Sequence, residues 1–111
     1  MEDSVLDKLV KALEKADGGS LIISDSLIDL YENSAKKKNP SFILDKSKLS
    51  SDKFKRDFCK FLLKAYSVAY EKFYKGYTCC NEVLARFWAG GIYGYQSSRT
   101  SLYWDEVNKF L

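Results

Sequence analysis

Histidine is absent from this chain of 111 residues, and glutamine and proline occur only once each. Without an imidazole, the chain lacks the commonest general base and cannot form a Ser-His or Cys-His nucleophile pair. The Gly-Gly pairs at positions 18–19 and 90–91 lack the lysine and hydroxyl residue of a phosphate-cradling loop. We therefore expect no catalytic residues, and we expect that the protein is not an enzyme.

The cysteines are too few and too closely spaced for a zinc site or a secreted disulfide framework. Cys79 and Cys80 are adjacent and only Cys59 remains, whereas structural zinc sites use spacings such as Cys-x-x-Cys. We expect no metal and no cofactor, and we expect the cysteines to fill space as small apolar residues. There is no apolar run of about 20 residues and no basic, apolar leader, so we expect a cytoplasmic protein without a membrane partner.

Six glycines and one proline are poor material for the many turns of an all-β fold. The length suits one domain, residues 1–111, and a hydrophobic content of 46% allows a packed core. The sequence predicts a mainly α fold, a small bundle of four to five helices around one long central helix. Few glutamines beside many lysines is a pattern of thermophilic proteins.

Two helices are expected in the first 38 residues. The first begins at an N-cap formed by Ser4 and ends at residues 17–19. The second is capped by Ser24 or Ser26 and ends at residues 36–40, where three lysines precede Asn-Pro. Residues 21–23 could form a short strand instead, and residues 39–50 read as a connector. The apolar stripes at helical spacing are Val5, Leu6, Leu9, Val10 and Leu13 in the first helix, and Ile23, Leu27, Leu30 and Tyr31 in the second.

The third helix has the clearest periodicity and should form the spine of the fold. It begins at Ser50 or Ser51, ends at Gly76 and would be about 25 residues long. Its apolar residues recur every three or four positions: Phe54, Phe58, Phe61, Leu62, Ala65, Tyr66, Ala69 and Phe73.

The last third of the chain has two interpretations. In the first, a helix over residues 81–88 continues to residue 95, and a terminal helix over 102–111 follows a polar turn at 97–100, with Ser101 as its cap. In the second, residues 92–95 pair with 101–104 as a β-hairpin, which would give a winged-helix arrangement. The turn has no Asn-Gly or Asp-Gly pair, which favours the helical interpretation.

The net charge of +3 conceals an uneven distribution. Residues 1–35 carry three lysines against eight acidic residues, a net charge of −5, whereas residues 36–75 carry twelve basic residues against four acidic ones, a net charge of +8. The last 36 residues carry three charges of each sign. The acidic first third and the basic middle also permit head-to-tail association of identical chains.

Within the third helix, four basic residues spaced three, four and four apart form a stripe on one face. Regularly spaced cations on a rigid helix can follow the phosphates of a nucleic acid, although a lysine-rich face is also common on solvated amphipathic helices. Arg99 lies in the polar turn and is difficult to explain by packing. The candidate nucleic-acid-binding residues are the stripe Lys53, Arg56, Lys60 and Lys64, supported by Lys36, Lys37, Lys38 and Arg99.

Aromatic residues near the C-terminus are either core residues, which we favour, or a base-stacking surface. They are Phe87, Trp88, Tyr93, Tyr95, Tyr103 and Trp104. In size, expected helicity and charge the chain resembles the small helical subunits of CRISPR effector complexes. This resemblance implies a nucleic-acid-associated accessory protein that contacts the phosphate backbone of DNA or RNA within a larger complex.

Two other functions remain open. One is a protein–protein interaction module that uses the aromatic residues, such as a viral or plasmid-encoded inhibitor or an assembly factor. The other is a winged-helix DNA-binding regulator, which requires the C-terminal hairpin.

Overall fold

The computed structural model describes residues 2–94 and 97–111, which form five α-helices and one short 3₁₀ helix. In chain order these are α1 (Asp3–Ala16), α2 (Asp25–Lys36), η1 (Lys46–Ser50), α3 (Asp52–Phe73), α4 (Asn81–Gly94) and α5 (Ser98–Asn108). No strand occurs in the part of the chain that the structure describes. The prediction of a mainly helical protein is confirmed.

The starts of α2 and α3 follow the side-chain capping rules. Ser24 and Ser51 accept hydrogen bonds from the backbone N–H groups three residues on and so begin these helices. α1 begins two residues earlier than expected, because Glu2 rather than Ser4 occupies its N-cap position, and the Glu2 side chain makes no capping hydrogen bond. The 3₁₀ helix η1, which begins where Asp45 accepts a hydrogen bond from the N–H of Ser47, was missed inside the predicted connector.

The C-terminal β-hairpin is not formed. Residues 92–94 belong to α4 and residues 101–104 belong to α5, while Tyr95 lies outside the described residues. The polar segment begins a helix instead of turning between strands, because the Ser97 hydroxyl accepts a hydrogen bond from the N–H of Thr100. α5 therefore starts at Ser98 and not near Ser101, and the winged-helix arrangement is absent from this part of the fold.

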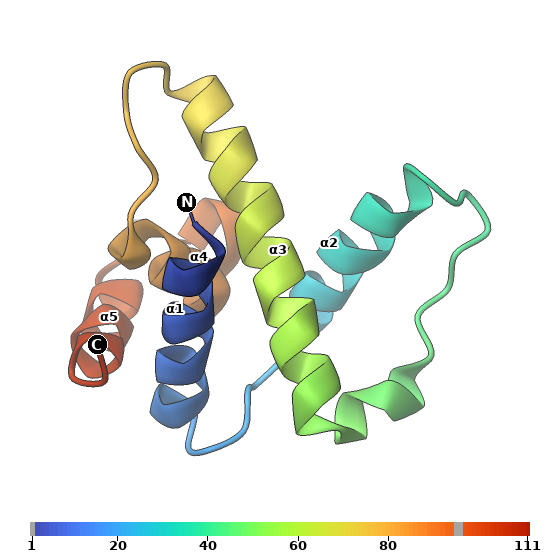
Figure 1. Cartoon of the computed structure of the whole chain (residues 1–111), viewed down its shortest axis with the longest axis horizontal. Helices are drawn as coiled ribbons and strands as arrows, with labels where there is room; N and C mark the ends of the chain where they lie inside the picture. The colour runs from blue at the N-terminus through green and yellow to red at the C-terminus, as the bar shows by residue number, and fades with distance from the viewer. Residues whose placement is uncertain (1, 95–96) are drawn as a thin grey trace.

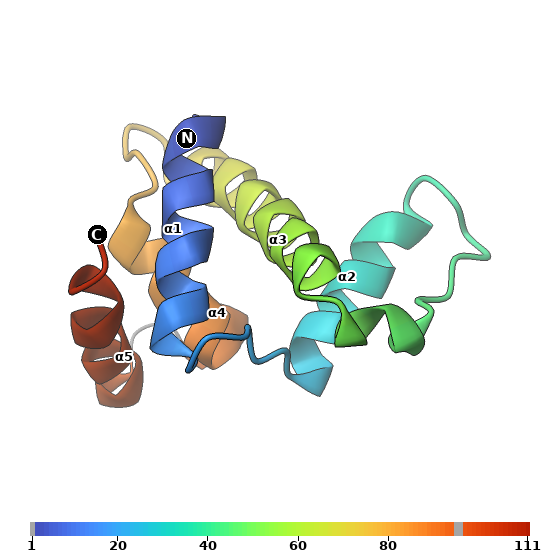
Figure 2. The ribbon, with the colours of Figure 1, turned by 60° about the horizontal axis from the view of Figure 1, so that its bottom comes forward.

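The helices on either side of α3 differ in how firmly they are packed (Figures 1 and 2). α1 contacts α3, α4 and α5, and α4 and α5 form an extensive pair, whereas α2 packs against α3 and α4 on the opposite side. The backbone of α5 lies beside α1 and α4 and not beside α3. A bundle around one long central helix is therefore not confirmed in that form, although α3, with 22 residues, is the longest helix described.

The core lies where α1, α3 and α4 meet. Tyr31 of α2 stacks on Phe58 at a ring-centroid distance of 4.5 Å, and Phe58 lies edge-on to Trp88 of α4 at 6.5 Å. Burial of these rings and of the aliphatic residues around them supplies the hydrophobic free energy of folding. The fully buried side chains include Leu6, Leu9, Leu13, Leu27, Phe58, Leu63, Leu84, Phe87 and Val107.

Asp17 joins three parts of the chain at the end of α1. Its carboxylate accepts hydrogen bonds from the N–H of Ile22, from Nε1 of Trp88 and from the hydroxyl of Tyr103, the last at 2.7 Å. Burial and the adjacent Asp17 carboxylate raise the pKa of Tyr103, so this hydroxyl stays protonated and donates. The contacts connect the α1–α2 segment to α4 and α5.

Among the described residues, no helix combines the length and the apolar composition needed to cross a membrane.

Candidate nucleic-acid interface

The predicted phosphate-binding stripe lies on α3, and three of its four cations face acidic side chains of α1. The pairs, with their N···O distances, are Arg56–Glu14 at 2.9 Å, Lys60–Asp7 at 3.0 Å and Lys64–Asp3 at 3.3 Å. From pair to pair the residue number rises along α3 and falls along α1, because the two helices run antiparallel (Figure 1). Asp3 and Asp7 are four residues apart, as are Lys64 and Lys60, whereas Glu14, seven residues beyond Asp7, pairs with Arg56.

Pairing with α1 changes the electrostatics of the stripe. A cleft of about 310 Å³ between the helices is lined by three cations and by the carboxylates of Asp7 and Asp57. The hydrogen bond from Lys60 to Asp7 raises the pKa of Lys60, which favours its charged form within the pair. Arg56, Lys60 and Lys64, which were predicted to bind phosphates, are thus paired with carboxylates of the same chain. The acidic residues of α1 that take part in these pairs belong to the segment that was considered for contact with a neighbouring copy.

Lys53, the fourth member of the stripe, pairs within α3. Its Nζ lies 3.7 Å from Asp57, and the two side chains are 83% and 70% exposed. An ion pair this open to water holds its charges weakly. Lys53 therefore remains accessible, although it is isolated from the cations that face α1.

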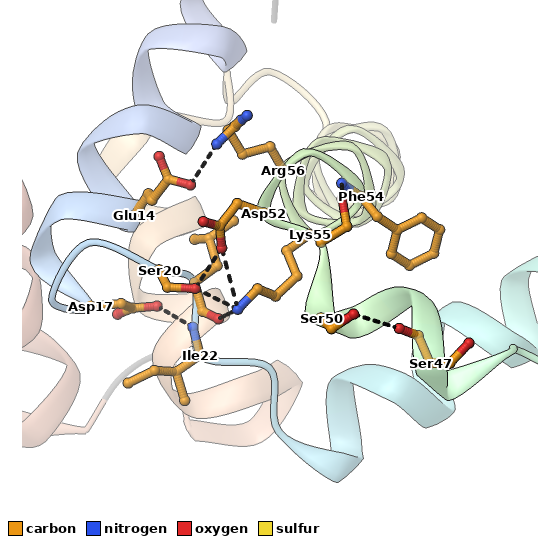
Figure 3. A network of polar contacts seen from close by, with 12 residues as sticks. Glu14, Asp17, Ser20, Ile22, Ser47, Ser50, Asp52, Phe54, Lys55 and Arg56 are labelled. Atoms are coloured by element: carbon orange, nitrogen blue, oxygen red, sulfur yellow. Dashed lines mark hydrogen bonds and ion pairs between the residues drawn. The ribbon is translucent and has the colours of Figure 1, made fainter.

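Lys55, which was not a candidate, has a structural role at the start of α3. Its Nζ donates hydrogen bonds to the hydroxyl of Ser20 and to the carbonyl of Leu21, and it pairs with Asp52 at 3.7 Å (Figure 3). Ser20 in turn donates to Asp52 at 2.7 Å. This cluster fastens the α1–α2 segment to α3 and leaves Lys55 only 16% exposed, so the lysine is unsuited to ligand contact.

A second groove lies on the other side of α3, at the end of α2. It has a volume of about 470 Å³ and a charge pattern unlike that of the α1–α3 cleft. Three lysines line it, and no carboxylate does so among the described residues. We call this the basic groove; its lining residues are Lys37, Phe61, Lys64, Ala65, Val68, Ala69 and Lys72.

The floor of the basic groove consists of apolar α3 residues, all of which except Val68 belong to the apolar stripe predicted from the sequence. Phe61 is 43% exposed and Val68 is 61% exposed, and Ala65 and Ala69 are also exposed. They form a second apolar row, one position away from the buried row of Phe58, Leu62 and Tyr66, in the part of α3 near the end of α2. Exposed apolar residues bordered by charges are typical of a binding surface.

The supporting lysines divide by position. Lys36, Lys37 and Lys38 are exposed at the end of α2, and Lys37 lines the basic groove. Residues 36–48 hold five lysines and one acidic residue, a net charge of +4, and none of the ion pairs found among the described residues involves Lys36, Lys37 or Lys38. Arg99 is exposed in α5, which packs beside α1 and α4, and it is not among the described residues that line the basic groove.

Lys72 and Val68 were not among the candidate residues. Phe58, Phe61, Leu62, Ala65, Tyr66 and Ala69 have the spacing of a single amphipathic helix face. The sequence pattern alone therefore gives no signal that Phe61, Ala65 and Ala69 stay exposed. Their exposure results from tertiary packing, because the neighbouring helices leave this part of α3 uncovered.

The aromatic residues near the C-terminus mostly pack in the core, as we favoured. Phe87 and Trp88 are buried, and Tyr103 and Trp104 pack against the core while partly exposed. Arg86 is also engaged, since it donates hydrogen bonds to Glu82 and to the carbonyl of Ser97. Nothing is described of the side chains of Tyr93 and Tyr95, which were part of the same prediction.

Two of the three cysteines are space-filling core residues. Cys59 is fully buried and Cys79 is 2% exposed, which confirms the prediction for these two. Burial raises the pKa of both thiols, that of Cys79 to about 12. Cys80 is exposed. No cluster of potential metal ligands is found in the part of the chain that the structure describes.

No protein-family model, no curated protein and no solved structure matches this chain.

Proposed function

We propose that the protein is a small nucleic-acid-associated accessory protein that contacts the phosphate backbone through the basic groove between α2 and α3. The observation that carries this proposal is the charge of the two clefts. Three lysines and no described carboxylate line the basic groove, whereas two carboxylates balance the cations of the α1–α3 cleft. A polyanion gains most where cations are not already paired.

The lysines in and near the groove supply the phosphate contacts. Lys37 comes from the end of α2, and Lys64 and Lys72 come from α3, so the contacts are fixed by two helices rather than by one flexible segment. Lys64 also pairs with Asp3, but both side chains are about 60% exposed, so a phosphate can displace that carboxylate at small cost. Lys36 and Lys38 extend the cationic surface beyond the groove.

Contact with the backbone implies little sequence preference. The groove residues are lysines, small apolar residues and Phe61, and none of the described lining residues is an asparagine, glutamine or arginine able to read a base edge with two hydrogen bonds. The ligand is therefore recognised by its charge and shape. This suits a subunit that supports a nucleic acid within a larger nucleoprotein complex, where base pairing or another subunit provides the specificity.

The experiment compares two triple variants that remove the same amount of charge. K37Q/K64Q/K72Q neutralises the basic groove, and K53Q/R56Q/K60Q neutralises the stripe, so both lower the net charge from +3 to zero. Binding to a labelled oligonucleotide is measured by fluorescence anisotropy at about 50 and 200 mM salt. We expect the groove variant to lower the slope of log K against log salt by roughly 2, since each lost phosphate contact removes about 0.7–0.9.

The stripe variant is the control, and it should keep most of the wild-type slope. Equal losses in the two variants would show that only net charge matters, and a larger loss in the stripe variant would restore the original assignment. Absence of wild-type binding at the lower salt concentration would refute the proposed function.

The apolar floor of the basic groove favours a second candidate function, a protein–protein interaction module. Phe61 and Val68 would contact the apolar side of an acidic amphipathic helix while the lysines pair with its carboxylates. A complex of this kind buries apolar surface, so its affinity should depend much less on salt than that of a phosphate complex. Tight, salt-insensitive binding of an acidic amphipathic peptide, together with no oligonucleotide binding, would favour this function.

A further inference from the structure

The C-terminal end of α3 carries aromatic side chains that the basic groove does not use. Phe73 is 80% exposed, Tyr77 is 70% exposed and Tyr74 is 40% exposed. In Figure 1 this end of α3 extends beyond the neighbouring helices, and the chain then turns back toward α4. We call Phe73, Tyr74 and Tyr77 the aromatic end of α3. Exposed large rings such as those of Phe73 and Tyr77, when they are bordered by charges, are typical of binding surfaces.

Two members of the aromatic end, Phe73 and Tyr74, belong to a row of ring contacts that starts in the core. Phe87 of α4 stacks on Tyr66 at a centroid distance of 4.1 Å, and Tyr66 is followed by Tyr70 at 6.3 Å. Tyr74 lies 4.8 Å from Tyr70, and Phe73 lies edge-on to Tyr74 at 4.9 Å. Phe73 and Tyr74 are therefore connected through partly buried rings to the buried Phe87, so these two side chains have less freedom to lose when a ligand binds.

The charges around the aromatic end are cationic. Lys72 and Lys75 flank Phe73 and Tyr74 in sequence, and residues 72–78 contain no acidic residue. The acidic residue nearest in sequence, Glu71, accepts a hydrogen bond from the backbone N–H of Cys79 and is thus engaged by the returning chain. Lys72 lines the basic groove and directly precedes Phe73, so the groove reaches the last turn of α3, where the aromatic end begins.

We infer that the aromatic end of α3 is a stacking platform for unpaired bases, so that the nucleic acid bound in the basic groove is single-stranded. This inference rests on the proposed function. A single strand offers phosphates to the lysines and exposed base faces to the rings at the same time, whereas a duplex keeps its base faces stacked inside. Cations interleaved with exposed aromatic rings are the recurring feature of surfaces that bind single strands without sequence preference.

The test uses the full chain, an oligothymidylate of about 20 nucleotides and a duplex of the same length. The wild type should bind the single strand more tightly. F73A/Y77A should lower single-strand affinity by roughly tenfold or more per ring, with little effect on the duplex and with an unchanged salt slope. Both side chains are largely exposed, so folding should be retained, and circular dichroism checks this.

Two further variants separate stacking from a general apolar contact. F73L/Y77L keeps apolar bulk but removes the ring faces, so it should bind as weakly as F73A/Y77A. I43A removes another exposed apolar residue, 78% exposed and close in sequence to the lysines of residues 36–48, and should bind like the wild type. If F73L/Y77L binds the single strand as tightly as the wild type, the stacking inference is overturned.

The outcomes also separate this inference from the proposed function. If K37Q/K64Q/K72Q loses binding while F73A/Y77A binds the single strand like the wild type, phosphate binding by the basic groove is supported and the stacking inference is overturned. Displacement of the oligonucleotide by poly-glutamate at equal charge concentration would show that any polyanion suffices, which overturns the inference. A wild type that binds no nucleic acid at about 50 mM salt removes both proposals.

Discussion

The ion pair between Arg56 and Glu14 should contribute measurably to stability, because it fixes α1 against α3. We expect the double-mutant cycle of R56Q and E14Q to give a coupling free energy of about 1 kcal/mol, at the upper end of the range for partly exposed pairs. The reason is geometric: the Nη1 and Oε2 atoms lie 2.9 Å apart, and the Glu14 side chain is only 17% exposed.

Urea unfolding of the wild type, the two single variants and the double variant, followed by circular dichroism, provides the four free energies of unfolding. The coupling should weaken when the series is repeated at about 1 M salt, where the screening length falls to about 3 Å.

The control cycle uses K53Q and D57Q on the same helix. That pair is 3.7 Å apart and far more exposed, so we expect no measurable coupling. If the Arg56–Glu14 coupling is no larger than that of the control, α1 does not neutralise the stripe. The assignment of the phosphate contacts to the basic groove rather than to the stripe would then be refuted.

Three further substitutions or modifications test other parts of the structure. Y103F removes the 2.7 Å hydrogen bond to the carboxylate of Asp17 and should lower the free energy of unfolding by about 1.5–2 kcal/mol in urea titrations. G91A should lower the free energy of unfolding by about 1–3 kcal/mol in the same assay, because Gly91 has φ 74° and ψ −172°, a conformation that residues with a Cβ rarely adopt. G90A, at a helical position, is the control and should be neutral or slightly stabilising. Alkylation of the native protein near pH 8, read by mass spectrometry, should modify Cys80 alone, since burial raises the pKa of the other two thiols; rapid modification of all three without denaturant would contradict their burial.

The helices could be predicted from sequence because their signals are local. Ser24 and Ser51 cap α2 and α3 as expected, and the apolar spacing of α1 marks the face that is buried. The errors arose where one local signal allowed two structures. The polar segment at residues 97–100 suits a turn between strands or a helix start, and the N-cap hydrogen bond of Ser97 decides the outcome only when α5 packs on α4.

The candidate site could be predicted only in part, because the neighbour of a charged face is set by tertiary packing. Arg56, Lys60 and Lys64 do form a regular row, as their spacing indicated. Asp3 and Asp7 have the same four-residue spacing in α1, but the sequence does not state that these two rows meet in antiparallel helices. Three of the eight acidic residues in the first third, Asp3, Asp7 and Glu14, pair with α3 of the same chain, while head-to-tail association of identical chains stays a prediction.

We propose that a nucleic acid binds in the basic groove and not on the cationic stripe that faces α1. Titration of ¹⁵N-labelled protein with an oligothymidylate, followed by amide chemical shifts, locates the ligand without any substitution. We expect the largest amide chemical-shift changes at the end of α2 around Lys37 and along α3 from Phe61 to Lys72, with further changes at Phe73 and Tyr77. Shifts concentrated along α1 and around Arg56, or no shifts at about 50 mM salt, would contradict it.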